Sequence, residues 1–278
     1  MCLDELFAHE DRFVGALSLR RVQAPQVGTR HAVGAGTVEV TADDVAEFDA
    51  LARRQGHPLP GGDVLMIATQ AIDYPSLGRC PALADDGRCA IHAARPSTCA
   101  MVPLDAWAPD RLQSVALAAK CRGGEHDIGA DCLSTAALPS QSLPEGFIPL
   151  VEAGRIADRG YASALTRRRD DEARDKQRWG DAVYRLLAPE LLGPARGIAG
   201  IPFAGYRTLP LVPALAVLAS DGAQARARCL RYIAAQRRLI DTTVDAALAR
   251  RHAADRPMTA QLRQFANALA ALGARLAQ

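Results

Sequence analysis

The most reactive side chains in this sequence belong to four cysteines, Cys80, Cys89, Cys99 and Cys121. Thiolates are soft, charged donors that bind zinc and iron well. Four of them complete a tetrahedral zinc site or hold an iron–sulfur cluster. We therefore predict a thiolate metal site built from these four residues, with Cys132 as an extra candidate ligand.

The first two cysteines are expected to face each other across a short hairpin. Residues 85–88 are typical of a tight turn, because aspartate starts such turns and Gly87 supplies the positive φ angle. This turn places Cys80 and Cys89 near the two ends of the hairpin.

The other two cysteines are also expected at turns. Arg95 precedes Pro96 and is therefore pushed toward extended geometry, which redirects the chain toward Cys99. Residues 115–119 resemble a strand, and Cys121 follows in a sharp Cys-Arg-Gly-Gly turn. Turns expose backbone N–H groups, which can hydrogen-bond to metal-bound sulfur.

The spacing of the cysteines bears on the identity of the metal. Structural zinc sites usually use Cys-x-x-Cys pairs, and this sequence has none. Wide, irregular gaps favour a cluster held by several loops, so we favour an iron–sulfur cluster of the 4Fe–4S type. Zinc, mononuclear iron and unmetallated cysteines are the alternatives. Cys132 is a spare ligand, a redox partner or a structural residue, Cys229 is expected in a helix core, and Cys2 at a frayed end.

The cysteine segment also resembles a known family. The motif reads Cys80-Pro81-x-Leu83, then Asp86-Gly87-Arg88-Cys89-x-Ile91-His92, then Arg95-Pro96-x-x-Cys99. Over residues 35–125 it resembles the YkgJ-type cysteine-cluster family, a family of zinc- or iron-chelating domains with some members labelled Fe–S oxidoreductases. Members usually carry another cysteine cluster before the first strand, whereas residues 29–36 of this chain contain no cysteine. The resemblance therefore implies a reduced version of the family's metal site.

Two histidines lie near the cysteines in sequence. His92 occupies a position where the family often has an aromatic residue, which favours a packing role. His126 stands between Glu125 and Asp127, close to Cys121. A histidine flanked by carboxylates can shuttle protons, or the group can form a polar turn.

The elements that must position the cysteines can be read from local patterns. Residues 37–40 alternate and are β-branched, which predicts a strand. Thr41 is a suitable N-cap for a helix running to about Arg54. Residues 64–68 predict a second strand that leads into the cysteine segment.

The second half of the chain has the pattern of helices. Helices are predicted over residues 160–187, over 221–252 and after Pro257. The last helix carries a narrow apolar stripe formed by Leu262, Phe265, Leu269, Leu272 and Leu276. A stripe of this kind packs into a core or against a second copy in a homodimer.

These patterns predict a helix-rich α+β fold with a small, irregular metal-binding domain and a C-terminal helical portion. We expect the cysteine-cluster domain at residues 1–135, with its core at 37–132. A Pro- and Ser-rich linker is expected at 136–150 and a helical domain at 151–278.

Composition excludes several classes of protein. The net charge of +2 argues against a nucleic-acid partner or an anionic membrane surface. The N-terminus has no secretory signal and the longest apolar run is too short for a membrane span. Seven cysteines in the reducing cytoplasm, where we expect the protein, point to metal or redox chemistry instead of disulfides.

Two functions follow from this reading. In the first, the cluster belongs to a redox or modifying enzyme whose substrate is unknown. In the second, a structural zinc folds a non-catalytic module, and the helical region binds a protein partner.

Overall fold

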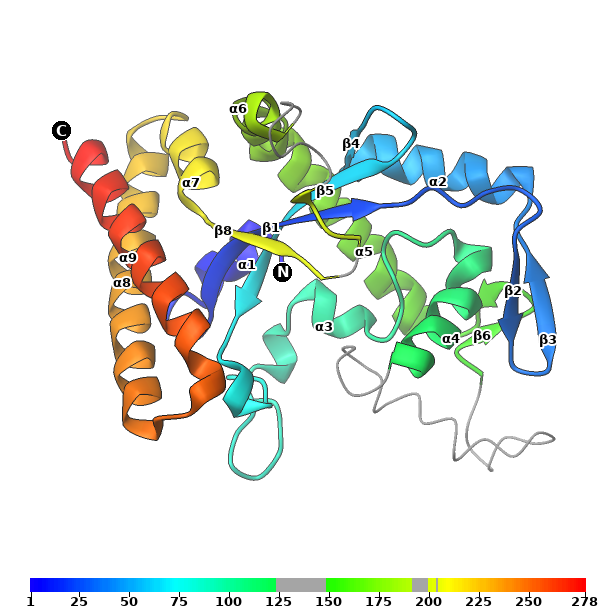
Figure 1. Cartoon of the computed structure of the whole chain (residues 1–278), viewed down its shortest axis with the longest axis horizontal. Coiled ribbons are helices and arrows are strands. Elements are labelled where there is room, and N and C mark those ends of the chain that lie inside the picture. Colours follow the sequence, from blue (N-terminus) through cyan, green and yellow to red (C-terminus); the bar gives the residue numbers. More distant parts are fainter. Residues whose placement is uncertain (124–148, 192–199, 204) are drawn as a thin grey trace. The chain divides into compact units, whose positions relative to one another are not determined.

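The predicted mixture of short strands and long helices is confirmed by a computed structural model, which describes residues 1–123, 149–191, 200–203 and 205–278 (Figure 1). The chain forms two compact units, each assembled from separated segments. Unit 1 comprises Met1–Arg21, Leu65–Arg95 and Arg174–Gln278, and unit 2 comprises Val22–Val64 and Pro96–Ala173.

Unit 1 is built around three strands in the order β5-β1-β8. They are β1 (Val14–Val22), β5 (Val64–Ile72) and β8 (Arg207–Pro210). β1 pairs antiparallel with β8, from Ala16 opposite Pro210 to Leu19 opposite Arg207. The first six residues of β1 are buried, so both faces of this strand are covered. The predicted strand at 64–68 is confirmed and continues to Ile72.

Helices supply the rest of unit 1. They are α1 (Leu3–Ala8), α6 (Asp181–Leu191), α7 (Val212–Ala219), α8 (Ala223–Arg250) and α9 (Arg256–Leu276). The helices predicted over 221–252 and after Pro257 are thereby confirmed as α8 and α9, which lie side by side (Figure 1). Cys2, expected at a frayed end, is instead buried beside α1.

The apolar stripe of α9 belongs to the core of unit 1. Leu262, Phe265, Leu269 and Leu272 are all buried, and Leu276 is partly exposed near the end of the helix. Of the two alternatives for this stripe, the structure shows core packing within the chain.

Unit 2 begins with a hairpin and a well-capped helix. β2 (Arg30–Val33) pairs antiparallel with β3 (Gly36–Glu39), which confirms the strand predicted at 37–40. α2 (Ala42–Gln55) starts at the predicted N-cap, where Thr41 Oγ1 accepts from the N–H of Asp44 at 3.3 Å. β4 (His57–Pro58) follows directly.

The remaining elements of unit 2 are short, except for one long helix. They are α3 (Ser97–Met101), α4 (Gln113–Gly123), the β6 (Val151–Glu152) and β7 (Arg155–Ile156) hairpin, and α5 (Arg159–Asp175), whose last two residues fall in unit 1. The prediction that residues 160–187 are helical is confirmed, although they do not form one continuous α-helix. They are divided into α5 and α6 by a π-helical turn, η7 (Lys176–Gly180).

The chain also contains short 3₁₀ helices. They are η1 (Pro75–Leu77), η2 (His92–Ala94), η3 (Asp110–Leu112) and η9 (Ala253–Asp255). No helix in the described ranges combines the length and the apolar character needed to cross a bilayer. Most of the predicted linker at 136–150 lies outside the described residues, so the boundary between a cysteine domain (1–135) and a helical domain (151–278) stays a prediction.

Candidate functional site

The hairpin predicted around residues 85–88 is confirmed, but its register differs from the prediction, because Cys89 lies opposite Leu83 and not opposite Cys80. An antiparallel bridge joins Leu83 to Cys89, and the N–H of Ala84 donates to the carbonyl of Arg88 at 2.8 Å. Gly87 closes the turn with a φ of 78°, a left-handed conformation that glycine adopts without strain. The hairpin thus holds Cys89 in its paired part, while Cys80 lies three residues before Leu83.

The sulfur of Cys80 lies in a polar backbone environment. The N–H of Ala82 points at Cys80 Sγ across 3.4 Å, and the N–H of Leu83 donates to the Cys80 carbonyl at 2.9 Å. Cys80 is an exposed free thiol and Cys89 is a half-buried one. An N–H group in this position can hydrogen-bond to a cysteine sulfur that ligates a metal.

Cys99 and Cys121 lie in unit 2, on helices. Arg95 is extended, as predicted, but the turn predicted at Cys99 is wrong, because Cys99 lies within α3. The strand predicted at 115–119 and the turn at Cys121 are wrong, because residues 113–123 form α4.

The helical state of α4 has a local and a tertiary cause. Its sequence is rich in alanine, the best helix former. The buried side chain of Gln113 fixes the start of the helix by donating to the carbonyls of Asp105 (2.7 Å) and Ala108 (2.9 Å). Near the other end, Lys120 Nζ donates to the carbonyl of Pro103 at 2.7 Å.

The predicted ligands are divided between the two units. Cys80 and Cys89 belong to unit 1, while Cys99 and Cys121 belong to unit 2. The four-cysteine centre stays a prediction from the sequence. Cys132 lies outside the described residues. Cys229 is buried in α8 as predicted, and burial raises the pKa of its thiol.

Of the two histidines singled out in the sequence, the structure describes His92. Arg95 Nη1 donates to His92 Nε2 at 3.0 Å, so His92 contacts its own loop. His9, just after α1, holds the same loop by a 3.2 Å hydrogen bond to the carbonyl of Ala94. His126 lies outside the described residues.

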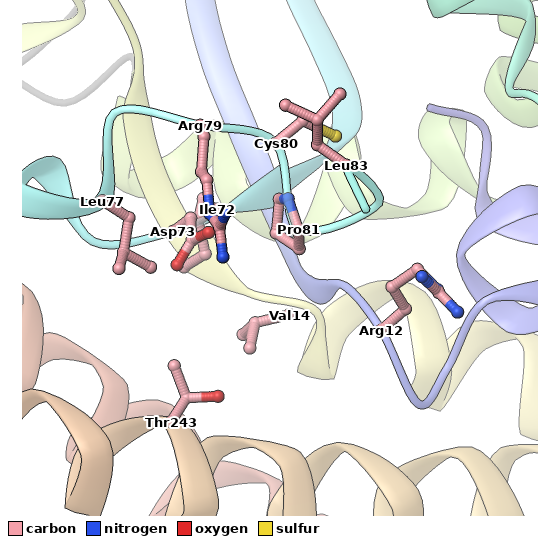
Figure 2. A pocket seen from close by; sticks show the side chains of 10 residues that line it. All are labelled: Arg12, Val14, Ile72, Asp73, Leu77, Arg79, Cys80, Pro81, Leu83 and Thr243. Atoms are coloured by element: carbon pink, nitrogen blue, oxygen red, sulfur yellow. The ribbon is translucent and has the colours of Figure 1, made fainter. Parts of the chain in front are cut away.

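A cavity of about 210 Å³ opens next to Cys80 within unit 1 (Figure 2). Its lining combines charged, apolar and sulfur-bearing side chains from four separate segments. They are Arg12, Val14, Ile72, Asp73, Leu77, Arg79, Cys80, Pro81, Leu83 and Thr243. A predicted metal ligand therefore forms part of the wall of a cavity.

The carboxyl group in this cavity has a perturbed pKa. Burial raises the pKa of Asp73, and the neighbouring charge of Asp255 adds to this effect. A hydrogen bond from the N–H of Tyr74, at 2.7 Å, and the charge of Arg250 act in the opposite direction. The net result is a raised pKa, which is common for carboxyl groups in ligand pockets.

Sequence reasoning missed Arg12, Asp73 and Thr243 as lining residues. Arg12 follows α1, Asp73 follows β5, and Thr243 is in the middle of α8. No local pattern distinguishes these three residues from other polar side chains. Only the order β5-β1-β8 and the packing of α8 bring them to one cavity.

Comparisons of the chain with protein-family models, with curated proteins and with solved structures found no significant match.

Proposed function

We propose that this chain is a metal-binding protein that holds an iron–sulfur cluster, most simply 4Fe–4S, through cysteine thiolates. The proposed ligands are Cys80, Cys89, Cys99 and Cys121, and their assignment rests on the sequence. Zinc and mononuclear iron are the alternative metals, with Cys132 as a spare ligand.

The observation that carries this proposal is the N–H of Ala82 aimed at Cys80 Sγ. Hydrogen bonds of this kind stabilise metal-bound sulfur and tune the potential of a cluster. The free thiols of Cys80 and Cys89, which flank and belong to the same glycine-closed hairpin, fit the same chemistry. Such thiols persist in a reducing compartment, so we assign the protein to the cytoplasm.

The redox or modifying enzyme is favoured over the non-catalytic module because Cys80 lines a cavity. A structural metal needs no adjoining cavity, since its role is to contribute folding energy. A bound cluster would supply electron transfer, while the residues of the chain would bind and orient a substrate beside it. A zinc-stabilised module whose helical region binds a protein partner is the alternative, and a homodimer through α9 would need a surface other than its buried stripe. With a net charge of +2, we expect no nucleic-acid partner.

The test is anaerobic purification of the full chain, followed by a visible spectrum and analysis of metal and inorganic sulfide. A brown protein containing iron and sulfide is the expected result. A colourless protein with one tightly held zinc would exclude the cluster and support the structural alternative. A protein with neither metal would contradict both.

A further inference from the structure

We propose that the surface around the Cys80 cavity docks a small acidic iron–sulfur protein, and that Arg12 and Arg79 each bind a separate acidic side chain of this partner. The inference deepens the proposed function and rests on it, because it names the substrate as a redox protein. In each encounter one electron leaves the reduced partner and enters the oxidised cluster, and no bond forms or breaks. The docking step itself depends on the surface residues and not on the metal.

The small net charge of the chain conceals a separation of charge between the two units. Unit 1 contains 22 lysine and arginine residues against 14 aspartate and glutamate residues, a formal charge of +8. Unit 2 contains 11 of the former against 17 of the latter, a formal charge of −6. A positive surface potential speeds the encounter with acidic proteins and disfavours basic ones. Unit 1, which carries Cys80, is therefore suited to an acidic partner.

The two arginines of the cavity are placed to bind different groups. Figure 2 shows Arg12 on one side of the cavity and Arg79, with Asp73 next to it, on the other. Within the described part of the chain, neither guanidinium makes a hydrogen bond or an ion pair. Asp73 is the one acidic residue among the ten that line the cavity, and it accepts the N–H of Tyr74. An acidic protein surface presents carboxylates at several points, so each arginine pairs with its own.

The space between the two arginines is apolar and open to solvent. Val14 and Pro81 lie between them, and Leu83 lies beside Cys80, to whose carbonyl its N–H donates at 2.9 Å (Figure 2). Cys80 and Pro81 are exposed, and so is 37% of Leu83. Protein interfaces combine an apolar centre with a polar rim, and weak redox complexes bury less than about 1,200 Å² in total. The surface around Cys80 has this composition on a small scale.

The exposure of the lining distinguishes a protein partner from a small ligand. Arg79, Cys80, Pro81 and Leu83 are all exposed, and the cavity has a volume of about 210 Å³. Pockets for small molecules are usually larger, at roughly 300–1,000 Å³, and bury most of the ligand surface. A small cavity with an exposed wall is covered better by the surface of another protein.

The same lining is poorly suited to a nucleic acid. A phosphate backbone is bound by several cationic side chains in succession, and unpaired bases stack on aromatic ones. The cavity lining contains no aromatic residue, and a carboxyl group, on Asp73, stands next to Arg79. An acidic protein is therefore favoured over a polyphosphate chain.

The test is isothermal titration of the full chain with a plant-type 2Fe–2S ferredoxin, a small acidic iron–sulfur protein. Binding is expected at low salt. It should weaken about tenfold or more between about 0.01 M and 0.1 M salt, because the Debye length falls from about 30 Å to about 10 Å. Cytochrome c, a small basic redox protein, and a DNA duplex are titrated in parallel. No binding of ferredoxin, equal binding of cytochrome c, or tighter binding of the duplex would overturn the proposal.

Variants locate the docking surface. Arg12→Glu and Arg79→Glu should each weaken ferredoxin binding about tenfold, because each change removes an attraction and adds a repulsion. Arg185→Glu is the matched control, since it reverses the charge of an exposed arginine of unit 1, on α6, that does not line the cavity. If Arg185→Glu weakens binding as much as the other two changes, the effect is general electrostatics and the proposed surface is wrong.

The double variant tests whether the two arginines bind separate groups. Independent contacts contribute additively, so Arg12→Glu combined with Arg79→Glu should weaken binding about a hundredfold. A double variant that binds as well as either single variant would overturn the assignment of separate acidic side chains. The comparison of ferredoxin with cytochrome c uses the unaltered chain, so it holds even if a variant does not fold.

Metal and sulfide are measured in the same samples. A cluster-loaded protein that does not bind ferredoxin would contradict only the docking surface. A metal-free protein that binds ferredoxin through Arg12 and Arg79 would support the docking surface and contradict the proposed cluster.

Discussion

The side chain of Gln236 in α8 is hydrogen-bonded to the N–H of Gly15 at the start of β1, with 2.9 Å between Oε1 and N. Its Nε2 donates to the carbonyls of Phe13 (2.9 Å) and Glu10 (2.8 Å). Only 1% of Gln236 is exposed. One buried amide thus satisfies three backbone groups and ties α8 to the chain that leads from α1 into β1.

Gln236→Leu should therefore destabilise the protein strongly. The change leaves the N–H of Gly15 and the carbonyl of Phe13 buried without partners, which costs about 3 kcal/mol in the free energy of unfolding. Urea unfolding followed by circular dichroism measures this loss. Gln224→Leu, at an exposed position of α8, is the matched control and should change stability by less than about 0.5 kcal/mol. Similar losses for the two variants would show that the buried hydrogen bonds contribute little.

Asp44→Ala should destabilise unit 2 by about 2 kcal/mol, since two interactions are lost together. Its carboxylate accepts from the N–H of the N-cap residue Thr41 at 2.7 Å and from Arg111 Nε at 2.9 Å. Burial alone would raise the pKa of Asp44, but the hydrogen bonds from Arg111 and Thr41 hold it below its ordinary value. The neighbouring Asp43 is exposed, so Asp43→Ala is the control. Thermal unfolding of both variants measures the difference, and an equal shift would argue against a special role for Asp44.

Acid pH should weaken the anchoring of α9 through Asp255. Burial raises the pKa of this carboxyl group, but hydrogen bonds from Ser76 Oγ (2.6 Å) and Arg250 Nη2 (3.0 Å) outweigh that effect and lower it overall. A carboxyl group whose pKa is lowered in the folded state stabilises the fold fully when the pH is above its pKa in the unfolded chain, about 3.9. This stabilisation is lost as the pH falls through the lower pKa of the folded state.

The measurement is the free energy of unfolding between about pH 6 and pH 3. Asp255→Asn should be less stable than the wild type near neutral pH and should lose less stability on acidification. Asp245→Asn, at an exposed position of α8, should follow the wild-type profile. Parallel profiles for the wild type and Asp255→Asn would contradict the prediction.

Substitution of the proposed ligands should remove the metal selectively. Cys89→Ser or Cys99→Ser should strip the metal, because serine is a poor ligand for soft metals. Cys229→Ser should leave the metal content intact, since Cys229 is buried in α8 and the raised pKa keeps its thiol protonated. Metal and sulfide analysis of the purified variants is the measurement. Loss of metal from Cys229→Ser alone would show that the ligand set is wrong.

Local sequence patterns were sufficient to predict those features of the structure that depend on residues close together in the sequence. The turn at Gly87, the N-cap at Thr41 and the apolar stripe on α9 were predicted correctly. In each case the physical cause lies within a few residues: a positive φ angle, an N–H group at a helix start, or the helical repeat.

The same reasoning gave a wrong prediction where a short apolar run is compatible with either a strand or a helix. Residues 115–119 contain valine, leucine and alanine, a pattern that suits a strand or a buried helix. The hydrogen bonds of Gln113 to the preceding loop favour the helix, and they arise only once that loop is folded.

By itself, the sequence determined the cysteine inventory, the turn at Gly87 and the helix-rich composition of the second half, whereas the register that puts Leu83 opposite Cys89 appeared only in the structure. Only the tertiary structure decided that Arg12, Asp73 and Thr243 share a cavity with Cys80. These residues come from segments separated by long stretches of chain, and each is an ordinary polar side chain in its own context. Their meeting depends on the pairing of strands and the packing of α8, which are properties of the whole fold.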